Sequence, residues 1–455
     1  MIQIETIETS GLGDRSYLAT DGEFAVVIDP QRDVDRVIKL VEERGVRVSH
    51  VLETHIHNDY VSGGLELSLL TGARYVVSAG DEVAFDRLAV NDGDVIEAGA
   101  MRLRVLHTPG HTHHHVSYTL EDTDGDVLGV FTGGSMLYGA TGRTDLLGPE
   151  HTDALTHAQF HSVRRLADEL PEETEVFPTH GFGSFCSATP TSGDASTVGT
   201  QRLVNPAFTL EEQVYVDTLV AGLDAYPAYY AHMGPINSQG PAPVDLSMPE
   251  PVSAPELRRR IEAGEWVVDL RERTAFATGH LTGSLGFELS TSFVTYLGWL
   301  YQWGTPLTLI GESAEQVAEA RRELVRIGID DLAGAAVGDI KELADGQPLG
   351  SYRVSDFAGL GEARKQAPVQ VLDARLNGER ATSRVIDSLH IPLHELLDRQ
   401  GEVPDGEVWV YCGAGYRASI AASVLDRPGR DIVLINDSFE ASKEAGLQEE
   451  PANAK

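Results

Sequence analysis

Cysteine is scarce in this chain, with only Cys186 and Cys412 among 455 residues. Two cysteines build no disulfide framework, so we expect both thiols to be free. This usage fits a reducing compartment, and a cytoplasmic protein is expected. The N-terminal residues lack a basic and apolar leader, and no apolar run reaches the ~18 residues needed to cross a bilayer. We therefore expect neither a signal peptide nor a membrane span.

Positively charged residues are also scarce. Lysine and arginine together number 35 against 70 aspartates and glutamates, and no lysine stands between Lys39 and Lys341. The formal net charge of -35 argues against nucleic acid or an anionic membrane surface as a partner. The hydrophobic share of 42% is ample for packed cores. At ~100–200 residues per domain, we expect two to four domains.

The chain divides into three parts. In residues 1–240, short apolar runs alternate with helical patterns, as in Phe24–Asp29 followed by Val34–Arg44. This alternation predicts α/β layers. Residues 241–255 are rich in proline and are expected to form a linker. Two further α/β domains with parallel sheets are expected at 256–348 and 355–450.

The last two parts resemble each other. Each begins with an apolar strand ending in D-x-R, and Asp373-x-Arg375 follows Asp269-x-Arg271 by 104 residues. A second apolar strand and a helical run follow in both. An internal duplication of a domain of ~100 residues is the simplest explanation.

Residues 54–60 read T-H-I-H-N-D-Y and predict a metal site. His55 and His57 point to the same side of an extended segment, and Asp59 reaches the same space. Imidazole and carboxylate are ligands that first-row metals accept. A dinuclear site of this type needs a histidine directly after the aspartate, where this chain has Tyr60. An ordinary two-metal hydrolase is therefore not expected.

Further loops follow in a defined order. They read T-P-G-H-T around His111, F-T-G-G ending at Gly134, G-R-T-D at 142–145 and P-T-H-G around His180. This order resembles the metallo-β-lactamase fold. Within that superfamily, G-R-T-D and the Asn-Pro pair at 205–206 resemble the persulfide dioxygenases.

The resemblance implies a four-layer αβ/βα sandwich with a mononuclear iron(II) site of two histidines and one carboxylate. His55 and His111 match the two histidines, whereas the carboxylate position is Gly134. Three outcomes stay open. His57 completes a three-histidine site, or Asp59, a water or an anion takes the third position, or the metal is lost. Iron(II) is the expected metal, with zinc or a metal-free degenerate site as alternatives.

For other side chains of residues 1–240, the sequence leaves alternative roles open. Arg143 offers a cationic fork to an anionic substrate, or forms a structural ion pair. Tyr60 contacts substrate or dioxygen, or packs in the core. His180 would bind the second metal of dinuclear relatives and is expected here as a hydrogen-bond partner. Cys186 is expected to be a small buried apolar residue, with a persulfide-accepting role as the alternative.

The segment around Cys412 predicts sulfur chemistry. An apolar strand leads into C-G-A-G-Y-R at 412–417, and a helix follows. Loop N–H groups and a helix N-terminus stabilise a thiolate or persulfide anion, and Arg417 adds a positive charge. The pattern resembles the rhodanese sulfurtransferases, with Asp373 and Arg375 matching their D-x-R strand as substrate-side residues. The middle domain lacks this cysteine and resembles an inactive rhodanese domain.

Together the resemblances imply a persulfide dioxygenase fused to a sulfurtransferase for sulfide detoxification. The expected partners are a low-molecular-weight thiol persulfide and thiosulfate or sulfite, with a homo-oligomer left open. Fusion would keep a reactive intermediate at high effective concentration. One alternative is a sulfurtransferase whose degenerate metal domain only binds substrate or a partner. The other is a zinc-dependent thioester hydrolase of glyoxalase II type.

Overall fold

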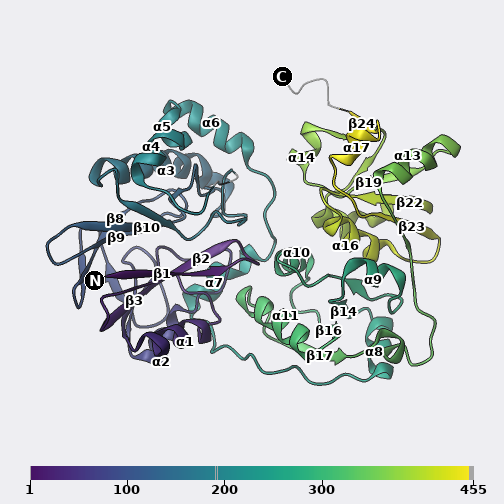
Figure 1. Ribbon diagram of the computed structural model, residues 1–455, viewed down its shortest axis with the longest axis horizontal. Helices are drawn as coiled ribbons and strands as arrows, with labels where there is room; N and C mark the ends of the chain where they lie inside the picture. Colours follow the sequence, from purple (N-terminus) through teal and green to yellow (C-terminus); the bar gives the residue numbers. More distant parts are fainter. Residues whose placement is uncertain (1, 190, 192, 450–455) are drawn as a thin grey trace. The chain divides into compact units, whose positions relative to one another are not determined.

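The computed structural model describes residues 2–189, 191 and 193–449 (Figure 1). The chain folds into two compact units. Unit 1 comprises Met1–Asp245 with Leu324–Gly328, and unit 2 comprises Leu246–Glu323 with Ile329–Lys455. Among the described residues, no helix combines the length and the apolar character that crossing a membrane requires.

Unit 1 is built on two β-sheets. The six-stranded sheet has the order β1-β2-β3-β4-β5-β6 and the five-stranded sheet the order β13-β10-β9-β8-β7. Their strands are β1 (Gln3–Thr9), β2 (Asp14–Thr20), β3 (Phe24–Ile28), β4 (Arg47–Leu52), β5 (Arg74–Ser78), β6 (Leu88–Val90), β7 (Val95–Ala98), β8 (Met101–His107), β9 (Val116–Glu121), β10 (Val127–Gly133) and β13 (Glu175–Pro178). A small ribbon pairs β11 (Met136–Leu137) with β12 (Ala140–Thr141).

Helices cover the outer face of each sheet. The helices of unit 1 are α1 (Asp35–Arg44), α2 (Gly64–Thr71), α3 (Pro149–Glu169), α4 (Val198–Val204), α5 (Pro206–Thr209), α6 (Glu212–Gly222) and α7 (Tyr230–Gln239). Val37 of α1 and Leu67 of α2 pack with Val27 and Val51 of the first sheet. Phe160 of α3 joins the core of the second sheet, and a third core, which contains Tyr17 and Phe131, lies between the sheets. The predicted αβ/βα sandwich is confirmed.

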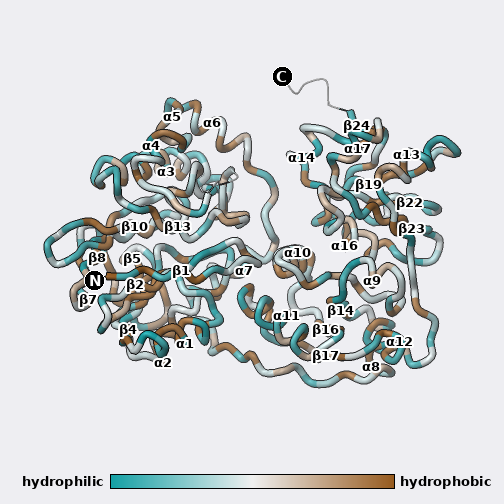
Figure 2. The backbone as a smooth tube through the Cα atoms, in the orientation of Figure 1, coloured by the Kyte–Doolittle hydropathy of each residue, from teal (hydrophilic) through white to brown (hydrophobic). Residues whose placement is uncertain are grey.

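Residue pattern explains why these helices form on the sheets. Figure 2 shows hydrophobic and hydrophilic residues alternating along α1, whose buried Val37 marks the face turned to the sheet. The long helix α3 begins with Pro149 at its first turn, where a missing N–H costs nothing. Its buried Leu155, Gln159 and Val163 recur at four-residue spacing on one face.

Unit 2 contains two parallel sheets. The first has the order β15-β14-β16-β17 and the second the order β18-β23-β22-β19-β21. The strands are β14 (Trp266–Asp269), β15 (Leu285–Gly286), β16 (Leu307–Gly311), β17 (Leu332–Val337), β18 (Arg353–Ser355), β19 (Gln370–Asp373), β21 (Leu389–His390), β22 (Gly406–Tyr411) and β23 (Arg430–Ile435), and a separate ribbon pairs β20 (Arg384–Val385) with β24 (Gln448–Glu449). The helices are α8 (Ala254–Glu262), α9 (Arg273–Thr278), α10 (Phe293–Leu300), α11 (Ala314–Arg326), α12 (Ile340–Leu343), α13 (Phe357–Gln366), α14 (Asn377–Thr382), α15 (Leu396–Arg399), α16 (Tyr416–Leu425) and α17 (Ala441–Glu444).

The two sheets of unit 2 share their strand order and a side-chain motif. β15-β14-β16-β17 corresponds to β21-β19-β22-β23, all paired in parallel. Arg271 binds Asp269 and the carbonyl of Gly279 at 2.8 Å. Arg375 binds Asp373 and the carbonyl of Ser383, also at 2.8 Å and again eight residues ahead. This repetition supports the inferred duplication, while the boundaries at 240, 255, 348 and 355 remain predictions.

Strand register assigns the position equivalent to Cys412 in the first sheet. Asp269 pairs with Ile310, and Asp373 pairs with Tyr411. The residue after Ile310 is Gly311, so the first sheet presents no side chain where the second presents a thiol.

Candidate metal centre and thiol site

Parallel strand pairing brings the acidic residues of the metal centre together. β3 and β4 are neighbours with Ile28 opposite Leu52, so Asp29 and Glu53 leave the sheet side by side. Both side chains are buried. The loop that follows β4 is held from α7, because the Asn237 amide donates to the carbonyl oxygens of His57 and Tyr60, each at 2.9 Å.

Hydrogen bonds at Nδ1 fix the ring orientation of His55 and His111. The Thr54 hydroxyl donates to Asp29 at 2.7 Å, so its oxygen accepts the Nδ1 proton of His55 at 2.9 Å. His111 donates from Nδ1 to the carbonyl oxygen of Arg143 at 2.8 Å. Both rings therefore keep the Nε2 lone pair for a ligand.

His180 has the same arrangement with acidic partners. Its Nδ1 lies 2.9 Å from Asp14 and 3.1 Å from Asp59, and all three side chains are buried. Burial alone lowers the pKa of His180, but these two carboxylates raise it well above its usual value.

The Nε2 atoms of His180 and His55 approach each other as metal donors do. Nε2 of His180 lies 3.4 Å from Nε2 of His55. Two donors at ~2.0–2.1 Å from a tetrahedral metal are separated by about 3.4 Å. Nε2 of His111 is buried and has no hydrogen-bond partner in the described chain, and burial followed by the charge on His180 lowers the pKa of His111 to about 3. His111 is therefore neutral, and the lone pair on its Nε2 is available to bind a metal.

The buried groups that could hold a metal share members. Among the described residues, the sets whose donor atoms lie within 4.8 Å of one another are His55, His57 and His180; His111, His180 and Cys186; Asp14, Asp59 and His180; and Asp29, Glu53 and His57. His180 belongs to three of them. The structure therefore has a candidate metal site built from histidine and acidic side chains.

His57 has acidic partners on one ring nitrogen. Its Nε2 lies 3.2 Å from both Asp29 and Glu53 and 3.0 Å from the Tyr60 hydroxyl. Burial lowers the pKa of His57, but the two carboxylates outweigh it and raise the pKa to about 9. Nδ1 of His57 is buried without a hydrogen bond in the described chain, so it is the atom that the predicted ligand role would use.

Tyr60 is oriented toward His57. Its ring stacks on His57 at a centroid distance of 4.3 Å, and its hydroxyl donates to the carbonyl of Asp29 at 3.2 Å. The side chain is fully buried. The structure supports the alternative role of Tyr60, which is packing against His57. Contact between Tyr60 and substrate stays a prediction.

Gly134 leaves no room for a side chain. A Cβ atom built there would lie 2.2 Å from Cδ2 and 2.8 Å from Nε2 of His111. The backbone N–H of Gly134 donates to His115 at 3.0 Å, which fixes this segment from the other side. No carboxylate can extend from this loop while His111 keeps its position.

Replacing Gly134 by alanine is expected to destabilise unit 1 by about 1–3 kcal/mol, the usual cost of overpacking a core. The added methyl must displace the buried His111 ring, so metal affinity should fall as well. Urea unfolding and metal titration measure both effects. Gly222→Ala is the matched control, because a Cβ there meets nothing within 4 Å in the described chain. Equal stability of the two variants would contradict the crowding.

Arg143 is surrounded by partners in the structure. Its guanidinium donates to Asp145 at 2.7 and 2.8 Å and to the carbonyls of Phe185 and Asp224, and it lies over the Tyr226 ring. The side chain is 4% exposed. This favours the structural ion pair that the sequence left open, and substrate binding by Arg143 stays a prediction.

Cys186 lies among the candidate metal donors, a position that the sequence analysis did not predict. The side chain is fully buried, as expected for an apolar role, yet its sulfur lies with the donors of His111 and His180. The sequence signal was its position six residues after His180. Sequence alone does not show that residues 142 and 187 pair and bring Cys186 inward.

The thiol site of unit 2 forms between β22 and α16. Cys412 is 2% exposed at the end of β22, and Gly415 caps α16 with φ of 86°. A Cβ at Gly415 would meet Asn436 Oδ1 at 2.3 Å, so both conformation and space require glycine. Arg417 lies against the loop near Gly413 and binds Glu379 at 2.8 Å. Sequence reasoning missed Glu379, which partly neutralises the predicted cation.

Asp373 and Arg375 lie in the scaffold beneath this loop. Asp373 accepts hydrogen bonds from Arg375 at 2.9 Å and from Tyr411 at 2.7 Å. The guanidinium of Arg375 lies 3.8 Å from the centre of the Phe439 ring. Both side chains are buried, and their predicted contact with substrate stays a prediction.

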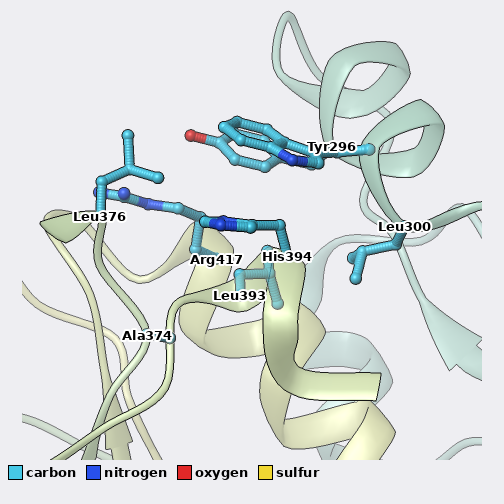
Figure 3. Close-up of a pocket in the computed structure, with 8 residues that line it drawn as sticks. Tyr296, Leu300, Ala374, Leu376, Leu393, His394 and Arg417 are labelled. Atoms are coloured by element: carbon cyan, nitrogen blue, oxygen red, sulfur yellow. The ribbon is translucent and has the colours of Figure 1, made fainter. Parts of the chain in front are cut away.

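A pocket of about 210 Å³, including space open to solvent, lies beside Arg417 (Figure 3). Tyr296 and Leu300 of α10 approach from one side, and His394 and Arg417 come from the other. Trp299 stacks on His394 at 5.1 Å. The domain without a thiol therefore supplies one wall of the pocket next to the Cys412 loop.

Comparison with known proteins agrees with this geometry. The profile of the metallo-beta-lactamase superfamily matches residues 12–180, and that of the rhodanese-like domain matches residues 358–445. The chain is 31% identical over 238 residues to the human mitochondrial persulfide dioxygenase ETHE1, a match that covers 51% of this chain and 81% of that protein. The chain belongs to the persulfide dioxygenase family of the metallo-beta-lactamase superfamily.

This persulfide dioxygenase family member carries a rhodanese-like domain, so the predicted fusion is confirmed. Hydroxyacylglutathione hydrolase of Cereibacter sphaeroides is 33% identical over 187 residues, covering 40% of this chain and 68% of that protein. A crystal structure described as a metallo-beta-lactamase from Staphylococcus aureus subsp. aureus COL aligns with a TM-score of 0.67 at 29% identity. The alignment covers 74% of this chain and 99% of that one.

Proposed function

We propose that unit 1 oxidises the outer sulfur of a low-molecular-weight thiol persulfide to sulfite, and that Cys412 of unit 2 transfers sulfane sulfur. The supporting observation is the set of buried imidazoles of His55, His111 and His180. Each ring is oriented by a hydrogen bond at Nδ1. Nε2 of His180 lies 3.4 Å from that of His55, and Nε2 of His111 has no hydrogen-bond partner in the described chain. Such a set fits a first-row metal in a chain of the persulfide dioxygenase family.

The residues of unit 1 fit iron(II). An iron(II) ion bound there would supply the redox chemistry that reaction with dioxygen requires. The chain itself orients the rings of His55 and His111 through the Thr54 hydroxyl and the Arg143 carbonyl. Burial of these side chains excludes bulk water from the site.

The transfer reaction follows from the surroundings of Cys412. The thiolate attacks the outer sulfur of thiosulfate, the S–S bond breaks, and sulfite leaves with the bonding electron pair. The resulting persulfide on Cys412 is an anion stabilised by the N-terminus of α16 and by Arg417. An acceptor such as cyanide or a thiolate then takes the sulfur and regenerates the Cys412 thiolate.

Iron-loaded protein supplied with glutathione persulfide is expected to consume one dioxygen for each sulfite formed. An oxygen electrode and sulfite analysis measure this ratio, and chelation of the iron should remove it. Absence of uptake from protein shown to contain iron would remove the dioxygenase. The function would then reduce to a sulfurtransferase whose first unit only binds substrate or a partner.

Thioester hydrolysis is the second candidate because hydroxyacylglutathione hydrolases are among the relatives. A two-metal site would need donors at positions 60 and 134. Tyr60 instead stacks on His57, and Gly134 has no space for a side chain. The geometry therefore favours the dioxygenase.

A further inference from the structure

The crowding at Gly134 removes the usual source of a negatively charged metal donor. His111 fills the space that a side chain at this position would need. A metal held by neutral imidazoles alone keeps its full positive charge in a buried site, which is unfavourable. The candidate donor group that contains His111 includes Cys186, whose buried thiol becomes an anion when it binds a metal.

Cys186 is held next to His111 by a single residue. The Arg143 N–H donates to the carbonyl of Cys186 at 2.8 Å, and the Arg143 carbonyl accepts from Nδ1 of His111 at 2.8 Å. The bridge between Gly142 and Ser187 extends this pairing. The backbone of Arg143 therefore contacts both the backbone of Cys186 and the ring of His111.

The donor atoms of this group are placed for one ion. Those of His111, His180 and Cys186 lie within 4.8 Å of one another, and all three side chains are buried. Nε2 of His111 has no hydrogen-bond partner in the described chain. Among the described residues, the Cys186 thiol makes one weak hydrogen bond, to the Tyr230 hydroxyl oxygen at 3.8 Å. An unpartnered imidazole nitrogen beside a thiol is a donor pair that iron, cobalt and zinc accept.

We propose that the thiolate of Cys186, together with His111 and His180, holds the metal of unit 1 in place of the carboxylate that Gly134 cannot provide. This inference rests on the proposed function only in taking unit 1 to bind a metal. Thiolate and carboxylate carry the same charge, so the exchange preserves the net charge of the site. Binding of the metal releases the Cys186 thiol proton to solvent. The Tyr230 hydroxyl then donates to the metal-bound sulfur.

This set differs from the one predicted from the sequence, which used His57. His57 belongs to a donor group with His55 and His180, and it lies outside the group that contains His111 and Cys186. His55 lies beside the proposed set, with its Nε2 3.4 Å from that of His180. A metal-bound Cys186 is also not free to accept a persulfide.

Cobalt(II) loading tests the proposal, because a thiolate ligand gives a near-ultraviolet charge-transfer band that nitrogen and oxygen ligands do not. The chain has two cysteines, so Cys412→Ala is a matched control for Cys186→Ala. Wild type and Cys412→Ala should both show the band. Cys186→Ala should lose it and bind cobalt at least ~10-fold more weakly. A band that survives in Cys186→Ala, or is absent from wild type, overturns the proposal.

A second measurement needs no change at Cys186. X-ray absorption of zinc-loaded Cys412→Ala protein should show one sulfur neighbour at ~2.3 Å. A shell of nitrogen and oxygen alone overturns the proposal even if Cys186→Ala does not fold. Oxygen uptake by iron-loaded protein is measured in a separate experiment. Uptake without a thiolate signal refutes only the ligand set, and a thiolate signal without uptake refutes only the dioxygenase.

Discussion

Replacement of Cys412 by serine is expected to lower thiosulfate:cyanide sulfur transfer by about 10⁴-fold or more, the scale on which loss of a catalytic nucleophile acts. A hydroxyl at this place is a far weaker nucleophile than a thiolate and forms no persulfide. The substitution removes no packing volume of note, so the fold of unit 2 should persist. Thiocyanate formation measures the rate.

A single-turnover experiment sharpens this test. Wild-type protein treated with thiosulfate should carry one cyanide-reactive sulfur per chain, and Cys412→Ser should carry none. Glu312→Gln changes the exposed residue that follows Gly311 in the equivalent loop of the other domain, and it should transfer at the wild-type rate. Sulfur loading that persists in Cys412→Ser would refute the assignment of Cys412.

Much of the fold could be predicted because its determinants are local. Alternating apolar and helical stretches predict layers, and the repeated D-x-R strand predicts two related domains. The repetition extends to hydrogen bonds that the sequence cannot display, such as those from Arg271 to Gly279 and from Arg375 to Ser383. Periodicity and spacing were sufficient here because each signal lies within one strand or one loop.

The metal centre was less predictable because its partners are distant in sequence. Asp29 and Glu53 meet only through the pairing of β3 with β4, and together they occupy Nε2 of His57. The position of Cys186 depends on its bridge to the segment of Arg143. A motif lists which residue types are present, whereas the register of strands and loops decides which of them meet.

Gly134 illustrates the same limit. The sequence shows that a carboxylate is absent, and it leaves open whether another group could fill the space. The structure places the His111 ring 2.2 Å from where a Cβ would lie. Whether a side chain fits at position 134 therefore depends on the position of the His111 ring.

Replacement of His111 by alanine is expected to abolish both metal retention and oxygen uptake. The ring supplies a neutral Nε2 without a competing partner in the described chain, so its loss removes a donor outright. Metal affinity should fall by more than the ~10–100-fold that loss of an outer-shell partner costs. Metal analysis after dialysis and the oxygen electrode measure the two effects.

His113→Ala is the matched control for that variant, because His113 is an exposed side chain two residues further along the same loop. It should keep both metal and oxygen uptake. In His111→Ala, sulfur transfer through Cys412 should continue, since the thiol and its loop belong to unit 2. Loss of transfer together with metal would mean that the substitution unfolds the chain. Retention of metal at the wild-type level would mean that the imidazoles of unit 1 do not bind the metal through His111.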